Sequence, residues 1–124
     1  MQLLLDTHVF LWWRMADASL KSEARRAISG ADQVYVSAAS AWEVAIKVAL
    51  GKLRIPEEFA TAVAASKFEE LPITFRHATL AGGLPPHHAD PFDRMLVAQA
   101  MSEGLTLVTH DTAFLAYGLP VIRT

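Results

Sequence analysis

Short apolar runs alternate with helix-like segments along this chain, and this alternation constrains its fold more than any other feature. Residues 3–5, 34–36 and 105–109 are strong strand candidates, and residues 71–73 and 121–122 are weaker ones. Runs that are apolar at every position are typical of parallel strands buried on both faces. The alternation therefore predicts an α/β fold with a mainly parallel sheet that helices cover on both faces.

Serines and glycines predict the limits of two helices in the first half of the chain. Ser19 is placed to cap a helix that ends near Ser29, and Gly30 follows as a stop. Either Ser37 or Ser40 can cap a longer helix that runs to residue 50, before a glycine at residue 51. We expect both helices to pack on the sheet.

Prolines mark further helix starts and a loop. Pro56 suits the first turn of a helix that carries Phe59. The best-marked start is at residues 90–93, where Asp90 fits the cap and Pro91 fits the first helical position. Residues 82–88 combine glycines, prolines and histidines, and this composition predicts a loop.

Length and composition indicate one packed domain over residues 1–124. A chain of 124 residues is close to the commonest domain size. Hydrophobic residues make up 52% and charged residues 19%, against about 45–50% and about 25% in typical soluble domains. The apolar surplus exceeds what a core of this size needs, so we expect part of the surface to be covered by a partner.

The sequence predicts a cytoplasmic protein that does not enter a membrane. No apolar run approaches the roughly 18–20 residues that a membrane-spanning helix needs. The first residues lack a basic leader and a small-residue cleavage site. The chain has no cysteine, so it has neither a disulfide framework nor a thiolate metal site, and a reducing compartment fits best.

Four acidic residues are placed to meet at one edge of the predicted sheet. Asp6 follows the first strand and Asp111 follows the strand at residues 105–109. Glu43 lies about two turns into the helix after the second strand, and Asp93 lies in the first turn of the helix that begins near Asp90. In an open parallel sheet, strand carboxyl ends and helix amino ends share the edge where ligands bind.

Carboxylates that crowd together repel each other unless a cation neutralises them. Mg²⁺ and Mn²⁺ prefer carboxylate oxygens and retained waters as ligands. Such ions activate water and stabilise charge on a phosphodiester, so no cysteine or serine nucleophile is required. The four acids therefore predict a Mg²⁺ site, with Mn²⁺ as the alternative ion, that supports phosphodiester hydrolysis.

Each acid also has a purely structural interpretation. Asp6 can end a strand, and Glu43 can be an ordinary surface residue of its helix. Asp93 can complement a helix dipole. Asp111 can cap the short helix through residues 114–115, with even odds between the two roles, and Asp90 is better explained as a cap than as a ligand.

Five segments in order resemble the PIN-domain family, and within it the VapC-type toxins of bacterial toxin–antitoxin pairs. They read LLDTH at residues 4–8, VSAASAWEVAIK at 36–47, GKLRIP at 51–56, DPFDRMLVAQA at 90–100 and LVTHD at 107–111. Any one of these segments is a weak signal. Together they run from near residue 4 toward the end of the chain, so the resemblance covers essentially all of it.

The resemblance implies a three-layer α/β/α sandwich that acts as a metal-dependent endoribonuclease. It implies that Asp6, Glu43 and Asp93 are the core metal and catalytic acids and that Asp111 is the more variable fourth. Thr7 and Ser37 match hydroxyl positions near the site, where they would hold waters or carboxylates, and Asp90 lies beside it. The family also implies an RNA substrate, a homodimer and a small antitoxin partner.

Other residues are candidates for contacts with RNA or with the antitoxin. Trp12 and Trp13 are either core residues or anchors of an antitoxin groove. Three basic residues, Lys47, Lys52 and Arg54, are either a phosphate-binding patch or solvated side chains.

Arg94 adjoins Asp93, where it either contacts RNA or pairs with an acid. His87, His88 and His110 are better explained as solvated residues than as metal ligands.

The net charge of −2 argues against RNA binding by the overall electrostatic field of the protein. Local basic groups and metal ions must therefore supply the attraction for RNA.

Two rival hypotheses share the predicted fold. A receiver-like phospho-acceptor domain needs a lysine at the end of a late strand, and residues 107–111 supply none. A catalytically silent binding module would need no metal, and the intact set of acids argues against it.

Overall fold

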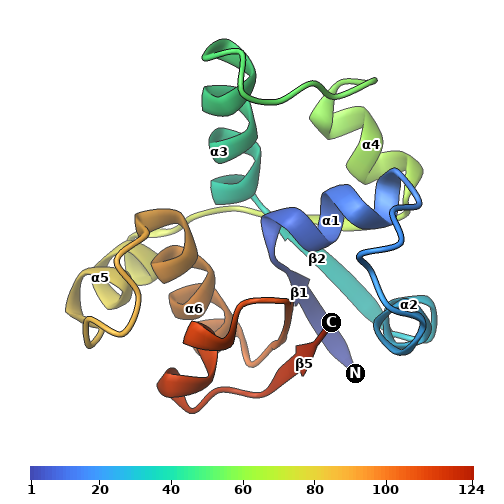
Figure 1. The fold of residues 1–124 in the computed structure, drawn as a ribbon. Coiled ribbons are helices and arrows are strands. Elements are labelled where there is room, and N and C mark those ends of the chain that lie inside the picture. Colours follow the sequence, from blue (N-terminus) through green and yellow to red (C-terminus); the bar gives the residue numbers. More distant parts are fainter.

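Five parallel strands form one central sheet in the computed structural model, which describes all residues 1–124 (Figure 1). The strand order is β3-β2-β1-β4-β5, and every neighbouring pair is parallel. The strands are β1 (Gln2–Leu5), β2 (Gln33–Ser37), β3 (Glu69–Leu71), β4 (Thr106–Thr109) and β5 (Val121–Arg123). The predicted parallel sheet is confirmed, although the weak candidate at residues 71–73 is shifted toward the amino terminus. Pro72 lacks the N–H that a continuing ladder needs.

Helices cover both faces of this sheet, which confirms the three-layer architecture. They are α1 (Thr7–Arg14), α2 (Ser22–Ser29), α3 (Ala38–Ala49), α4 (Phe59–Ala65), α5 (Phe75–Gly83), α6 (Pro91–Glu103) and the 3-10 helix η1 (Thr112–Tyr117). Leu3 and Leu5 of β1 belong to a core cluster with α1, α2 and α4, whereas Leu4 belongs to a second cluster with α6 and Phe114. Successive side chains of one strand thus enter opposite layers.

Several predicted helix limits are confirmed and others are wrong. Ser37 caps α3 by accepting the backbone N–H of Ala39, and Asp90 caps α6. Ser19 does not cap α2, which begins at residue 22, because its backbone N–H is bonded to Asp17 within a separate turn. Pro56 lies outside α4, which begins only at residue 59.

Two helices were absent from the sequence prediction. The helix α1 follows β1 directly, with Asp6 as its cap. The helix α5 includes Gly82 and Gly83 in its last turn, so the predicted loop begins later, at Leu84. No helix in the structure is both long enough and apolar enough to span a membrane.

Candidate metal centre

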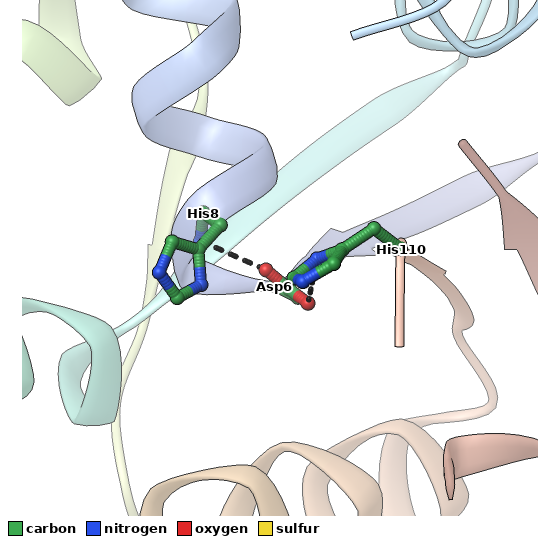
Figure 2. A group of neighbouring side chains, drawn as sticks. All are labelled: Asp6, His8 and His110. Carbon is green, nitrogen blue, oxygen red and sulfur yellow. Dashed lines mark hydrogen bonds and ion pairs between the residues drawn. The ribbon is translucent and has the colours of Figure 1, made fainter. Parts of the chain in front are cut away.

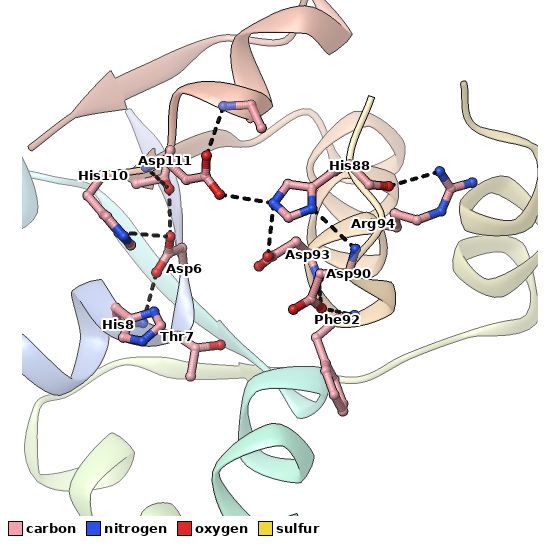
Figure 3. Close-up of polar contacts among 12 residues, drawn as sticks. Asp6, Thr7, His8, His88, Asp90, Phe92, Asp93, Arg94, His110 and Asp111 are labelled. Carbon is pink, nitrogen blue, oxygen red and sulfur yellow. Dashed lines mark hydrogen bonds and ion pairs between the residues drawn. The ribbon is translucent and has the colours of Figure 1, made fainter. Parts of the chain in front are cut away.

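Asp6 lies where β1 ends and α1 begins, and it is almost completely buried (Figure 3). Its Oδ1 accepts the backbone N–H of His8 at 2.8 Å and that of Val9 at 3.2 Å. Its Oδ2 accepts the hydroxyl of Thr109, at the end of β4. These donors satisfy a buried carboxylate and fix its orientation, while Oδ2, which accepts only one of them, keeps a lone pair for a further ligand.

Glu43 reaches the same edge of the sheet from α3. Its Oε1 lies 2.8 Å from the hydroxyl of Thr7, and its Oε2 lies 3.0 Å from the Nζ of Lys47. The Thr7 hydroxyl also lies 2.8 Å from that of Ser40. Thr7 therefore joins the first turn of α1 to α3, and it ties Glu43 to the segment that carries Asp6. This is the position near the acids that the resemblance implied for Thr7.

Ser37 has a different set of contacts. Its hydroxyl bonds to the side-chain carbonyl of Gln99, a completely buried residue of α6, and it accepts the N–H of Ala39. Gln99 in turn donates to the carbonyl of Pro72. Ser37 thus fixes α6 against β2 and does not contact an acid of the site.

His88 joins the remaining two acids. Its Nε2 lies 3.1 Å from Oδ2 of Asp93 and 2.9 Å from Oδ2 of Asp111 (Figure 3). Its Nδ1 accepts the backbone N–H of Asp90 at 3.2 Å. Because Nδ1 acts as an acceptor, the neutral ring carries its proton on Nε2 and donates it toward the carboxylates. In addition, Asp111 caps η1 by accepting the N–H of Ala113, which was one of the two roles that the sequence left open for it.

The charges of the site act most strongly on Asp93. Burial, together with the neighbouring charges of Asp90, Asp6 and Glu43, raises the pKa of its carboxyl group to about 7, while His88 opposes this rise. In contrast, the N–H of Ala113 and the imidazole of His88 keep the pKa of Asp111 below its ordinary value. The site thus holds one acid whose charged form is unfavourable unless a cation is close.

The four predicted acids meet at one edge of the sheet but not at one point. Asp93, Asp111 and His88 have possible ligand atoms within 4.8 Å of one another, and Asp6 forms a second such group with His8 and His110. Glu43 belongs to neither group, although its charge acts on Asp93. Buried carboxylates that destabilise each other's charge are a donor set that fits a hard divalent cation.

The other residues predicted to contact RNA or an antitoxin differ in how closely they pack against the protein. Trp13 packs against Phe68 with its ring centroid 5.6 Å away, as a core residue does. Trp12 also packs against that core, and its ring lies 5.0 Å from that of His110, beside the acids. Lys47 and Lys52 line a cavity together with Thr7 and His8, and Arg54 is exposed.

Arg94 supports the loop that carries His88. Its guanidinium donates to the backbone carbonyls of Ala81, Leu84, Pro85 and His88, at 2.9 to 3.4 Å. Those bonds fix residues 84–88 over the amino end of α6. The structure thus gives Arg94 a structural role, and its contact with RNA or an antitoxin stays a prediction.

Three histidines lie closer to the acids than the sequence predicted. The sequence favours solvated side chains for His88 and His110, yet both lie against acids of the site, and His8, for which the sequence predicted no role, lies beside Asp6. His87 does point away from the acids, with its ring 5.0 Å from that of Tyr117. The sequence offers one indication for His8 and His110, because each lies within two residues of a predicted metal ligand.

Comparison with known proteins assigns the family. The sequence matches the PIN domain over residues 3–119, nearly the whole chain. The chain belongs to the PIN-domain family. This PIN domain is also 34% identical, over 116 residues, to Ribonuclease VapC22 of Mycobacterium tuberculosis. The alignment covers 87% of this chain and 85% of that protein. The predicted resemblance to VapC-type PIN domains is confirmed, and the receiver-domain hypothesis is wrong.

Solved structures show the same fold. A DNA-bound VapBC of Salmonella typhimurium superposes with a TM-score of 0.70 at 20% identity, covering 99% of this chain and 98% of that one. A toxin–antitoxin complex of Klebsiella pneumoniae gives a TM-score of 0.66 at 24% identity, covering 97% and 95%. Since these identities are low, the likeness establishes the architecture of this PIN domain and nothing about its partners.

Proposed function

We propose that this PIN domain is a metal-dependent endoribonuclease, the toxin of a toxin–antitoxin pair, and that Asp6, Glu43, Asp93 and Asp111 hold its metal. The observation that carries the proposal is the partly buried carboxyl of Asp93, whose pKa is raised to about 7 at an edge where three further acids gather. The similarity to Ribonuclease VapC22 supports RNA as the substrate.

A bound Mg²⁺ or Mn²⁺ would activate water and stabilise the charge that develops on the phosphodiester. Within the protein, Asp6 and Glu43 are oriented by backbone N–H groups, Thr7 and Lys47 before any ion arrives. His88 keeps Asp93 and Asp111 side by side through its Nε2 proton. Pre-ordered ligands lower the cost of assembling the site.

The test is RNA cleavage by the purified protein with Mg²⁺ or Mn²⁺, followed by removal of the ion with EDTA. We expect Asp6→Asn and Asp93→Asn to reduce cleavage by at least ~100-fold, since each removes a charged ligand. Asp17→Asn is the matched control, because Asp17 is exposed and only caps a turn. Cleavage by Asp93→Asn at the wild-type rate would refute the assignment.

Calorimetry separates the nuclease from a silent binding module of the same fold. The nuclease must bind Mg²⁺ or Mn²⁺, and Asp93→Asn must weaken that binding. If neither ion binds to the wild-type protein, the chain is a binding module despite its acids.

We further propose a homodimer and an antitoxin partner for this PIN domain. Support for the antitoxin comes from solved relatives, which include the toxin–antitoxin complex of Klebsiella pneumoniae. Support for a protein interface also comes from an apolar groove of about 460 Å³ between β2, α3 and α4, which includes Val36, Ala41 and Phe59. Co-expression with a candidate antitoxin, a small open reading frame to be sought next to the gene, followed by co-purification and loss of RNA cleavage, tests this partner.

A further inference from the structure

Two exposed histidines flank the buried carboxylate of Asp6 (Figure 2). His8 is the second residue of α1, and His110 directly follows β4. Both rings lie on the side of Asp6 that faces away from His88, as Figure 3 shows. We propose that Asp6, His8 and His110 form a binding site for a divalent transition-metal ion of the Zn²⁺ or Co²⁺ class.

The distances suit such an ion after small side-chain rotations. One possible ligand atom from each residue lies within 4.8 Å of the others, and Nδ1 of His110 is 3.7 Å from Oδ2 of Asp6. Metal–nitrogen and metal–oxygen bonds of about 2.0–2.2 Å place neighbouring ligand atoms roughly 3–3.5 Å apart. Because both imidazoles are exposed, small rotations within their present rotamers can close this gap without moving the core.

Both imidazoles are available to a ligand. The ring nitrogens of His8 take part in no hydrogen bond, and the only polar contact of the His110 ring is the one to Asp6. His88 differs in this respect, because its Nδ1 is held by the N–H of Asp90 and its Nε2 therefore carries a proton where a lone pair would be needed. The geometry thus selects His8 and His110 and excludes His88 as ligands.

Trp12 holds the two rings near each other. Its ring centroid lies 6.1 Å from that of His8 and 5.0 Å from that of His110, and the two imidazoles are 5.4 Å apart. Packing against a large, partly buried indole restricts the rotamers of both histidines. This restriction reduces the entropy that binding would otherwise cost.

The donor set determines which ions bind. Imidazole nitrogens suit Zn²⁺ and other late first-row ions, whereas Mg²⁺ prefers carboxylates and water. Two histidines and one carboxylate leave coordination positions open to water. The inference goes beyond the proposed nuclease function and shares only Asp6 with it.

Zn²⁺ calorimetry and the visible spectrum of added Co²⁺ test the site directly. We expect one Zn²⁺ per chain and intense Co²⁺ absorption bands in the wild-type protein, both persisting in excess Mg²⁺. His8→Ala and His110→Ala should each weaken Zn²⁺ binding by about 10-fold or more. His87→Ala is the matched control and should bind as the wild type does, since His87 contacts Tyr117 instead.

The outcomes distinguish this site from the proposed nuclease centre. Zn²⁺ binding that survives Asp93→Asn but fails in the double variant of His8 and His110 supports the inference even if no RNA is cleaved. Equal Zn²⁺ affinity in the double variant and the wild type would overturn it, whether or not Mg²⁺ supports cleavage. Because both histidines are exposed, an unchanged circular dichroism spectrum should confirm that each variant is folded.

Discussion

At the scale of single residues, the hydrogen bonds of each acid determine how freely it carries a charge. Asp6 accepts three donors and Glu43 accepts two, so both carboxylates are compensated within the protein. Asp93 is more than half buried, and the Nε2 proton of His88 that it contacts is shared with Asp111. In the metal-free protein the charged form of Asp93 is therefore destabilised, and a bound cation would remove this destabilisation.

This cost predicts how stability depends on pH. The pKa of Asp93 is about 7 in the folded protein against 3.8 for an ordinary aspartate. The folded state therefore binds more protons than the unfolded chain between these values, and metal-free stability falls as the pH rises from about 4 to 7. Asp93→Asn should remove this loss and raise the free energy of unfolding at pH 8 by about 2 kcal/mol, after discounting for solvent screening.

Thermal denaturation in EDTA measures this effect. The gain should be largest at pH 8 and should shrink toward pH 4, where Asp93 is protonated in both states. Asp17→Asn is the control. The N–H of Ser19 lowers the pKa of Asp17, so removing the charge of Asp17 should not raise the free energy of unfolding. A gain for Asp93→Asn of equal size at pH 5 and pH 8 would contradict the electrostatic explanation.

Thr7 offers a test of ligand positioning. Thr7→Val keeps the shape of the side chain but removes the hydroxyl that lies 2.8 Å from Glu43. We expect Mn²⁺ affinity to fall by about 10–100-fold, as is usual when a group that orients a ligand is lost. The variant should also lose about 1–3 kcal/mol of stability, because a buried acceptor is left unpaired.

Calorimetric titration with Mn²⁺ measures the change in affinity. Thr79→Val, on the exposed face of α5, serves as the control and should leave both quantities unchanged. Wild-type affinity in Thr7→Val would mean that Glu43 needs no help from Thr7.

The residue types of the site could be predicted from the sequence, but their contacts could not. Asp6 follows β1 directly and Asp111 lies two residues beyond the end of β4, so the parallel sheet places them at one edge. The contact of His88 with two acids depends on how the loop at residues 84–90 folds over α6. That path is set by long-range bonds from Arg94, which no local pattern reveals.

At the scale of elements, two glycines near helix ends are expected to affect stability in opposite directions. Gly104 ends α6 with a left-handed φ of 68°, whereas Gly82 lies inside α5 with a helical backbone and open space around it. Alanine at residue 104 should therefore destabilise the protein by about 1 kcal/mol. Alanine at residue 82 should stabilise it by about 0.5–1 kcal/mol, because glycine is entropically unfavourable within a helix.

Urea denaturation of the two variants measures both effects, and each serves as the control for the other. If both variants change the free energy of unfolding in the same direction, the backbone conformation at one of the two glycines is not the one described.

A second prediction at this scale concerns Arg94. Arg94→Ala should release the loop at residues 84–90, because four carbonyls lose their shared donor. We expect hydrogen exchange of that loop to accelerate by at least ~10-fold, while exchange in β1 and β4 stays unchanged. Lysine should not rescue the loop, since a single ammonium lacks the planar fork that reaches several acceptors.

Arg26→Ala, on the exposed surface of α2, is the matched control for lost charge. Unchanged exchange in the loop of Arg94→Ala would show that other contacts hold His88 in place.

Elements were predictable where local signals agreed with tertiary packing. The start of α6 has both a capping acid and a proline at its first position, and it lies where expected. The sequence predicted no helix at α1, because an acid directly after an apolar strand favours a metal ligand, yet in the structure Asp6 also caps this helix. The helix α5 was missed because two glycines near its end favour a loop, and packing on α6 overrides that preference.

At the scale of the whole molecule, the apolar surplus of the sequence remains visible on the surface. Two helical layers already cover the sheet, yet Phe75 is 95% exposed and Trp42 is 63% exposed. The ring of Trp42 lies 5.4 Å from that of Phe92, so α3 and α6 present aromatic surface beside the acids. Large exposed aromatic side chains are typical of protein interfaces.

The proposed homodimer can be tested through this aromatic surface. We expect the wild-type protein to sediment as a dimer and Trp42→Glu to sediment as a monomer, because a buried charge without a partner disfavours association. Loss of an aromatic anchor alone weakens a dimer by about 2 kcal/mol or more, which is roughly 30-fold in the dissociation constant. Leu115→Glu is the control, since η1 lies on the opposite side of the molecule from α3 (Figure 1). A dimer that survives Trp42→Glu but is lost in Leu115→Glu would place the interface at η1 and leave the aromatic surface for another partner.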